Sequence, residues 1–240
     1  MKDNYTHLVM VVDRSGSMGP LWGETVEGIK GYVEEQMKVA GYATMTLKVF
    51  DDRHDTVFDF QDIIGLNGKE IKEFGPRGMT ALYDAIGKAI NETGTKLANM
   101  DEKDRPSKVL FLIVTDGLEN ASQKFKAPDI AKMIKHQEDK YSWEFTYLGA
   151  NQDAVLEGSS MGMRGGTVNY AATPQGTAAA YKMAARSHHL HRLSSKKLDK
   201  GYALGLKLGD PQDVSASTVL DDADFEAMVE AVKTGSTGTA

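Results

Sequence analysis

Two short apolar runs, each followed by an aspartate, constrain the fold of this sequence more than any other feature. Residues 8–12 are rich in valine and are closed by Asp13, and residues 108–115 form the most apolar stretch of the chain and precede Asp116. Continuous apolar runs of this length are typical of strands that are buried on both faces of a parallel sheet. We therefore expect both runs to be central strands.

Segments with strand and helix patterns alternate along the rest of the chain. Residues 25–40 and 82–97 place apolar side chains three and four positions apart, which predicts two amphipathic helices. The alternation continues with a helix over 127–136, a strand over 143–148, a weaker repetition over 151–156 and 168–170, and a helix from Thr173-Pro174 to about residue 195. This order predicts an α/β fold: a Rossmann-like, doubly wound, mostly parallel sheet with helices on both faces.

One pair of segments departs from the parallel pattern. Residues 44–50 and 56–60 alternate polar and β-branched or aromatic side chains around the turn-like residues 51–55, which predicts an antiparallel hairpin at a sheet edge. At the other end of the sequence, residues 201–240 lose clear periodicity and finish in TGSTGTA, which indicates a loose tail.

The overall composition excludes several classes of protein. The 240 residues carry a formal net charge of −6, so no basic field attracts nucleic acid or anionic lipid. The chain has no cysteine, which excludes disulfides and thiolate metal sites. Its first apolar run is far shorter than the roughly 20 residues of a membrane span, and it does not resemble a signal peptide. We expect a cytoplasmic protein with no membrane partner, its charge disfavours a nucleic-acid partner, and the sequence leaves its oligomeric state open.

Oxygen-bearing side chains follow both central strands and a third, distant loop. Asp13, Ser15 and Ser17 alternate in a tight loop after the first strand, Thr80 stands between a glycine-rich loop and a helix, and Asp116 follows the second strand. Ligands of doubly wound folds collect at the carboxyl ends of the strands, where Asp13 and Asp116 are expected. Hard divalent cations prefer oxygen ligands of this kind. The alternative is that the hydroxyls cap helices and the aspartates make only loop hydrogen bonds.

These three segments resemble the metal-ion-dependent adhesion site of the von Willebrand factor type A family, over about residues 5–195. The resemblance implies a Rossmann-like sheet with one antiparallel edge strand, a domain over residues 1–195 and an acidic, partly flexible extension over residues 196–240. It also implies that Ser15, Ser17 and Thr80 are hydroxyl ligands of Mg²⁺, or of Mn²⁺ or Ca²⁺, while Asp13 and Asp116 supply charge and orient water. In that family a partner protein's Asp or Glu completes the coordination, so we expect a cation-dependent binding module without enzymatic activity.

Two other classes of site, and a purely structural metal site in a scaffold protein, compete with this interpretation. A strand that ends in Asp13 is also typical of aspartyl phosphohydrolases, but those need a second acid where this chain has Ser15. Dinucleotide binding requires G-x-G-x-x-G after the first strand, and the sequence there is DRSGSMG. Both alternatives therefore lack a required group.

Two further groups of charged residues invite functional interpretations. His188, His189 and His191 stand in a basic stretch that could contact phosphate or a transition metal, but we expect a solvated helix end. Acidic side chains gather near the C-terminus and are expected to be solvated, although one of them could occupy the metal site of the same or a neighbouring molecule; they are Asp210, Asp213, Asp221, Asp222, Asp224 and Glu226.

Overall fold

A six-stranded sheet forms the centre of the protein in a computed structural model that describes residues 1–66, 70–150, 152–163, 166–195, 198–199, 203–204 and 219–235. The strand order is β3-β2-β1-β4-β5-β6, and every neighbouring pair is parallel except β2 and β3. The predicted α/β sheet with one antiparallel edge strand is confirmed. The strands are β1 (Lys2–Asp13), β2 (Tyr42–Phe50), β3 (His54–Asp62), β4 (Pro106–Thr115), β5 (Glu144–Ala150) and β6 (Thr167–Tyr170).

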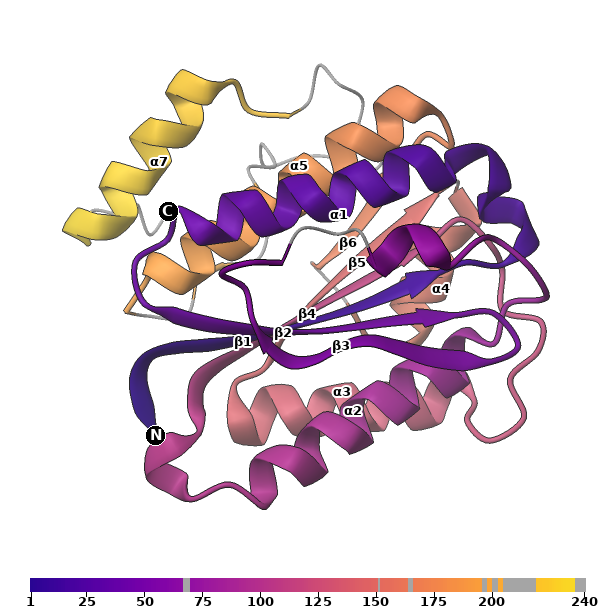
Figure 1. The fold of residues 1–240 in the computed structure, drawn as a ribbon, viewed down its shortest axis with the longest axis horizontal. Helices are drawn as coiled ribbons and strands as arrows, with labels where there is room; N and C mark the ends of the chain where they lie inside the picture. The colour runs from indigo at the N-terminus through magenta and orange to yellow at the C-terminus, as the bar shows by residue number, and fades with distance from the viewer. Residues whose placement is uncertain are drawn as a thin grey trace.

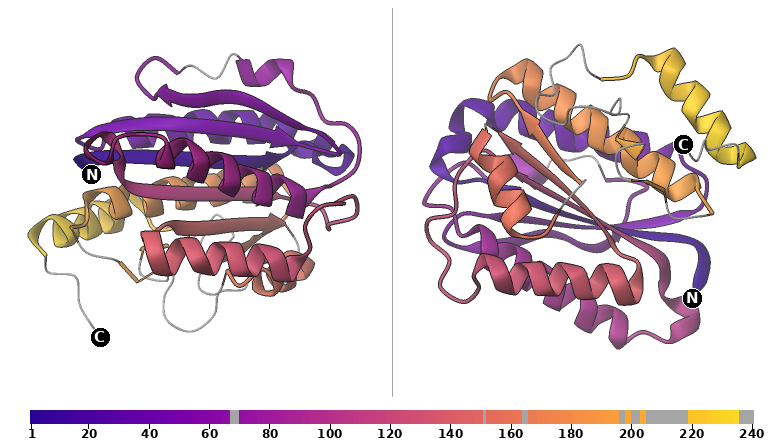
Figure 2. Two further views of the ribbon diagram at one scale, coloured as in Figure 1. Left: turned by 90° about the horizontal axis from the view of Figure 1, so that it is seen from below. Right: turned by 180° about the vertical axis from the view of Figure 1, so that it is seen from behind.

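Helices cover both faces of this sheet (Figure 1). Helices α1 and α5 lie on one face and α2 and α3 on the other, and two further directions of view show the same layers (Figure 2). The helices are α1 (Trp22–Met37), α2 (Leu82–Ala98), α3 (Ala127–Tyr141), α4 (Gln152–Ser160), α5 (Pro174–Leu193) and α7 (Asp222–Thr234), with short 3₁₀ helices at Gly16–Leu21, Glu70–Glu73 and Glu102–Asp104.

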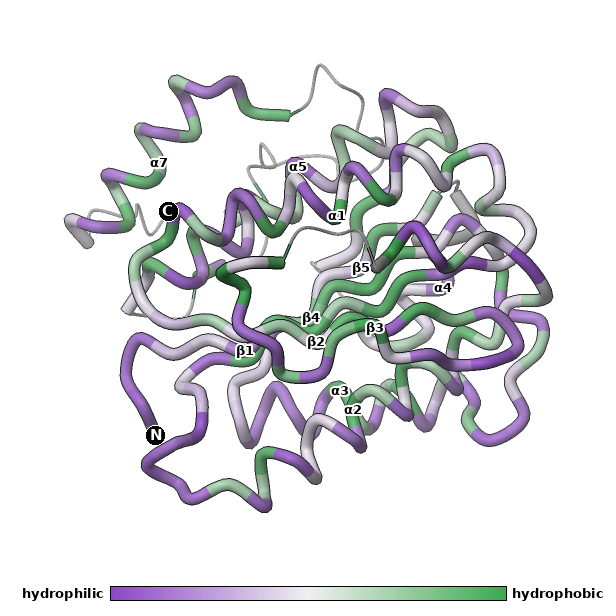
Figure 3. Tube along the Cα trace, in the orientation of Figure 1, coloured by the Kyte–Doolittle hydropathy of each residue, from purple (hydrophilic) through white to green (hydrophobic). Residues whose placement is uncertain are grey.

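The apolar side chains of the strands form a core on each side of the sheet. In β1, Leu8, Met10 and Val12 face the layer of α1 and α5, whereas Val9 and Val11 face α2 and α3. The hydrophobic colour in Figure 3 accordingly follows the central strands, while the helices carry both colours. Burial on both faces explains why β1 and β4 are continuous apolar runs in the sequence.

The sheet topology places the two aspartates that follow the central strands at the carboxyl end of the parallel sheet. Strands β1 and β4 are parallel neighbours with Val12 paired to Val114, so Asp13 and Asp116 follow the same end of adjacent strands. The chain leaves β1 towards β2 on one side, while β4 lies on the other side. In doubly wound sheets, such a switch point leaves room for a ligand between the diverging loops.

Helices α1 and α5 pack so closely that one glycine is required between them. A β-carbon at Gly28 of α1 would lie 2.5 Å from the ring of Tyr181, a side chain of α5 that is itself buried. We expect Gly28→Ala to lower the free energy of unfolding by about 1–3 kcal/mol through overpacking. Gly31→Ala is the matched control, because nothing lies within 4 Å of its β-carbon position, and it should stabilise the helix by about 0.5–1 kcal/mol. Urea unfolding of both variants measures these changes. Equal changes in the free energy of unfolding for Gly28→Ala and Gly31→Ala would contradict the packing argument.

The prediction of a solvated, histidine-rich helix end is wrong. The basic stretch lies inside α5 and is buried where α5 contacts α1 and α7; its buried members are Arg186, His188, His189, His191 and Arg192. The ring of His188 bonds the Tyr32 hydroxyl at 2.5 Å and lies 3.3 Å from the Thr146 hydroxyl. Burial, helped by the charges of His191 and Arg192, lowers the pKa of His188 to about 3, so this ring is neutral. Lys196 and Lys197, which continue the basic stretch in the sequence, lie outside the described residues.

The expectation of a loose tail is wrong for residues 222–234, which form helix α7. Its buried side chains Phe225, Val229 and Val232 form a small hydrophobic cluster with Leu190 of α5. The carboxylate of Asp221 accepts the first-turn bond from the Asp224 amide at 2.8 Å, and Gly235 ends the helix with φ 71°. The position of the domain boundary near residue 195 stays a prediction.

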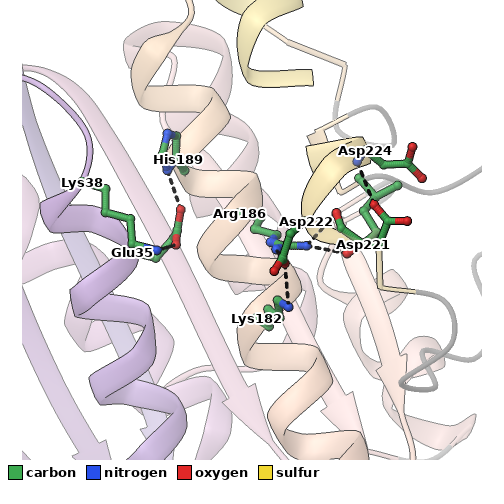
Figure 4. A network of polar contacts seen from close by, with 9 residues as sticks. Glu35, Lys38, Lys182, Arg186, His189, Asp221, Asp222 and Asp224 are labelled. Carbon is green, nitrogen blue, oxygen red and sulfur yellow. Dashed lines mark hydrogen bonds and ion pairs between the residues drawn. The ribbon is translucent and has the colours of Figure 1, made fainter. Parts of the chain in front are cut away.

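Polar contacts fix α7 and α1 to α5 (Figure 4). Asp222 pairs with Arg186, and with Lys182 at 3.2 Å. On the other side of α5, His189 lies 2.7 Å from Glu35 of α1, and this hydrogen bond lowers the pKa of Glu35 to about 2. Asp222 is therefore engaged at α5, whereas Asp210 and Asp213 lie outside the described residues. Among the described residues, no helix has the length and apolarity needed to cross a bilayer.

Candidate metal centre

Asp13 is held rigidly at the end of β1. Its side chain is buried; Oδ1 accepts a hydrogen bond from the Ser15 amide at 2.6 Å, and Oδ2 accepts one from the Thr115 hydroxyl at 2.5 Å. The Thr115 hydroxyl also accepts a bond from the Gly117 amide at 3.1 Å. These bonds connect the loop after β1 to the loop after β4, because Thr115 is the last residue of β4.

Hydroxyls of the first loop reach the second aspartate. The Oγ atoms of Ser15 and Ser17 are 3.0 Å apart, and the Ser17 hydroxyl donates to Oδ1 of Asp116 at 2.7 Å. Ser15 is buried, whereas Ser17 is exposed and Asp116 is half-buried. The group therefore opens to solvent on the side of Ser17 and Asp116.

Thr80 joins this group beside Gly117. A β-carbon at Gly117 would lie 3.1 Å from Thr80 Oγ1, 3.3 Å from Ser17 Oγ and 3.7 Å from Asp13 Oδ2. Three oxygens, two from the end of β1 and the loop after it and one from the Thr80 loop, thus lie within 3.7 Å of one point, which the glycine of the loop after β4 leaves free. The structure brings together all five residues that the sequence selected, Asp13, Ser15, Ser17, Thr80 and Asp116.

The two aspartates make this space favourable for a cation. Burial raises the pKa of Asp13 to about 6, hydrogen bonds from Thr115 and Ser15 oppose the shift, and the charge of Asp116 adds to it. Burial also raises the pKa of Asp116, against the hydrogen bond from Ser17. A positive ion between two desolvated carboxylates offsets both the desolvation and the repulsion. With its all-oxygen donor set, the group therefore fits a hard divalent cation. The described ranges hold no cluster of three or more histidine or acidic side chains that could bind a metal instead.

An ion-pair network that the sequence did not predict fastens the Thr80 loop to β1. The buried carboxylate of Asp51, just after β2, lies 3.2 Å from Nε of Arg14 and 2.6 Å from Nε of Arg77. Arg14 also pairs with Asp55. Burial would raise the pKa of Asp51, but bonds from Arg77 and the Arg53 amide and the two guanidinium charges together lower it. Asp51 is therefore a charged link between the two loops.

Backbone hydrogen bonds complete the frame on both sides of Thr80. The Arg77 amide donates to the Arg14 carbonyl at 2.8 Å, and the Gly16 amide donates to the Gly78 carbonyl at 3.2 Å. On the other side, the Thr80 amide donates to Oδ1 of Asn120 at 2.9 Å, and the Asn120 amide donates to the Thr80 carbonyl at 3.0 Å. The sequence carried no distinctive signal for Asn120 or Asp51, because both residue types are common in turns.

Comparison with solved structures identifies the fold. No family model and no curated protein sequence matches this chain. The von Willebrand factor domain of the type V pili tip protein Mfa5 from Porphyromonas gingivalis matches with a TM-score of 0.59 at 12% identity, over 81% of this chain and 98% of that chain. A von Willebrand factor type A structure from Catenulispora acidiphila matches with a TM-score of 0.51 at 14% identity, over 75% of this chain and 42% of that chain.

A third match includes a metal. Proximal thread matrix protein 1 from the mussel byssus, with a zinc-occupied metal-ion-dependent adhesion motif, has a TM-score of 0.54 at 14% identity, over 78% of this chain and 46% of that chain. This chain thus spans less than half the length of the second and third proteins. The predicted resemblance is confirmed at the level of the fold, which is that of von Willebrand type A domains.

Proposed function

We propose that this protein is a divalent-cation-dependent binding module that recognises an acidic side chain of a partner protein. The observation that carries the proposal is the convergence of Asp13, Ser17 and Thr80 oxygens within 3.7 Å of one point beside Gly117. Ser15 and Asp116 join this group through the Ser17 hydroxyl. The zinc-occupied motif of the mussel protein supports the view that this fold can hold a divalent ion. Oxygen donors favour Mg²⁺, with Mn²⁺ and Ca²⁺ as alternatives.

Each of the five side chains has a role in this proposal. Ser15, Ser17 and Thr80 would supply neutral oxygens, and the two aspartates would supply charge and orient water. A bound cation would supply a positive centre with a coordination position for an outside carboxylate. Because Ser17 is exposed and Asp116 is half-buried, the partner would approach on their side. Asp13 would stay below, held by Ser15 and Thr115.

The hydrolase alternative finds less support in the surroundings of Asp13. Both of its carboxylate oxygens accept hydrogen bonds from the protein, and position 15 offers a buried hydroxyl instead of an acid that could protonate a leaving group. We therefore propose binding without a catalytic step. A purely structural metal site would need no opening, whereas this group is open at Ser17.

Removing one proposed ligand tests the site. We expect Thr80→Ala to weaken Mg²⁺ binding by roughly tenfold or more, because the substitution removes an oxygen from the group that converges beside Gly117. Thr95→Ala is the matched control, since Thr95 is an exposed residue of α2, and its affinity should equal that of the wild type. Calorimetric titration with MgCl₂ measures the Mg²⁺ affinity of the wild type, Thr80→Ala and Thr95→Ala. Equal affinities of the wild type and Thr80→Ala, or no Mg²⁺ binding by the wild type, would contradict the proposal.

A further inference from the structure

Two large apolar side chains are exposed directly beside the candidate metal centre. Met79, which precedes Thr80, is 57% exposed, and Leu118, which follows Gly117, is 52% exposed. Neither belongs to a hydrophobic cluster of the described residues. The fold therefore leaves exposed two side chains of a type that it buries elsewhere.

The two loops that carry these side chains are joined. The Thr80 carbonyl accepts hydrogen bonds from the amides of Asn120 at 3.0 Å and Ala121 at 3.2 Å, and the Thr80 amide bonds the Asn120 side chain. Met79 thus directly precedes Thr80, and Leu118 lies two residues before Asn120, the residue to which Thr80 is bonded. An apolar surface on such a frame needs little ordering when a partner binds.

The charges around the centre limit what this surface recognises. The carboxylates of Asp13 and Asp116 would neutralise a divalent cation, so little positive field remains to attract a phosphate polymer. Arg77, two residues before Met79, has Nε on Asp51 at 2.6 Å and its terminal nitrogen 3.6 Å from Asp55. Its guanidinium is therefore already engaged by carboxylates. The exposed apolar side chains are therefore the feature beside the centre from which a carboxylate-bearing ligand would gain further affinity.

We propose that the partner is a protein segment in which an aspartate or glutamate stands within two residues of a large apolar side chain. This inference rests on the proposed function: the acid would complete the metal site, and its apolar neighbour would pack against Met79 and Leu118. Burying apolar side chains next to a polar anchor is a common source of affinity at interfaces. Methionine suits such a surface, because its flexible side chain adapts to different apolar partners.

Selection from a displayed peptide library tests this inference. The library has one fixed aspartate and randomised flanks, and it is selected on the full chain in MgCl₂ and in EDTA. We expect Mg²⁺-dependent enrichment of Leu, Ile, Met or Phe within two residues of the aspartate. A peptide enriched in this way should bind the Met79→Ser/Leu118→Ser double variant at least about tenfold more weakly than the wild type, with Mg²⁺ affinity unchanged.

A third variant and two contrary outcomes make the test specific. Ile64→Ser is the matched control, because Ile64 is an apolar side chain that is 78% exposed. Ile64 follows the end of β3, whereas the candidate metal centre lies towards the start of β3 at His54. Peptide binding by this variant should equal that of the wild type. Mg²⁺-dependent peptides without an apolar preference, or with equal affinity for the double variant, would overturn this inference and leave the proposed function standing. If the wild type binds Mg²⁺ but enriches no peptide in a Mg²⁺-dependent way, both proposals fail.

Discussion

Replacing Asp51 by alanine is expected to lower the free energy of unfolding by about 3 kcal/mol. The substitution removes the carboxylate that lies between Arg14 and Arg77, and it leaves the guanidinium of Arg14, whose side chain is only 4% exposed, without its buried partner. The effect should fall at the lower end of the range for broken buried ion pairs, because Asp55 still contacts Arg14. Urea unfolding at pH 7 measures the change.

The neighbouring Asp52 provides the control for this prediction. Asp52 is exposed, and its replacement by alanine should change the free energy of unfolding by no more than about 0.5 kcal/mol. Asp51→Ala should also weaken Mg²⁺ binding, since the Thr80 loop would lose the ion pairs through Asp51 that support its backbone hydrogen bonds to the loop after β1. A loss of less than about 1 kcal/mol would show that the network adds little to the fold.

The second large effect is expected from Asp13→Asn, which should stabilise the metal-free protein at pH 8 by about 2–3 kcal/mol. Burial raises the pKa of Asp13 from 3.8 to about 6, so the unfolded chain releases this proton first and the folded protein loses stability as the pH rises from about 4 to 6. An asparagine carries no charge to desolvate, and its side-chain oxygen can still accept the bond from the Ser15 amide.

The same substitution should abolish any stabilisation by Mg²⁺. Thermal and urea unfolding of both proteins between pH 3 and 8, in EDTA and in MgCl₂, measures both effects, and Asp52→Asn is the matched control. In EDTA the advantage of Asp13→Asn should disappear below about pH 4, where the aspartate is protonated in both states. A variant that is less stable than the wild type at pH 8 in EDTA, or that keeps the Mg²⁺ response, would contradict the account of Asp13.

Much of the fold and of the candidate site was predictable because local patterns and topology agree. The continuous apolar runs of β1 and β4 specify strands buried on both faces, and parallel neighbours bring Asp13 and Asp116 to one edge. The alternation in β2 and β3 specified the hairpin. The pattern of residues singled out Thr80 as an oxygen donor, but only the family resemblance placed it with Asp13 and Asp116, because its approach to them depends on loop conformation.

What the sequence did not reveal depends on packing between distant elements. The burial of His188 and Arg186 follows from α1 and α7 lying against α5. The sequence does carry a signal for α7 itself, because Phe225, Met228, Val229 and Val232 have the three- and four-residue spacing of an amphipathic helix. Asp51 stands in a stretch of five residues that is typical of a turn, and nothing local distinguishes a buried ion-pair acceptor from a turn residue. The exposure of Met79 and Leu118 is likewise a property of the folded loops.

Direct detection of an outside carboxylate on the bound cation tests the central claim most directly. Electron–nuclear double resonance is measured on the Mn²⁺-loaded protein with acetate that carries ¹³C at its carboxyl carbon. A ¹³C coupling reports that an oxygen of this carboxylate coordinates the Mn²⁺ ion. The account predicts a ¹³C coupling for the wild type and for Thr95→Ala, and no bound Mn²⁺ signal for Asp13→Asn. Bound Mn²⁺ without a ¹³C coupling in the wild type, or the same spectrum for Asp13→Asn, would contradict it.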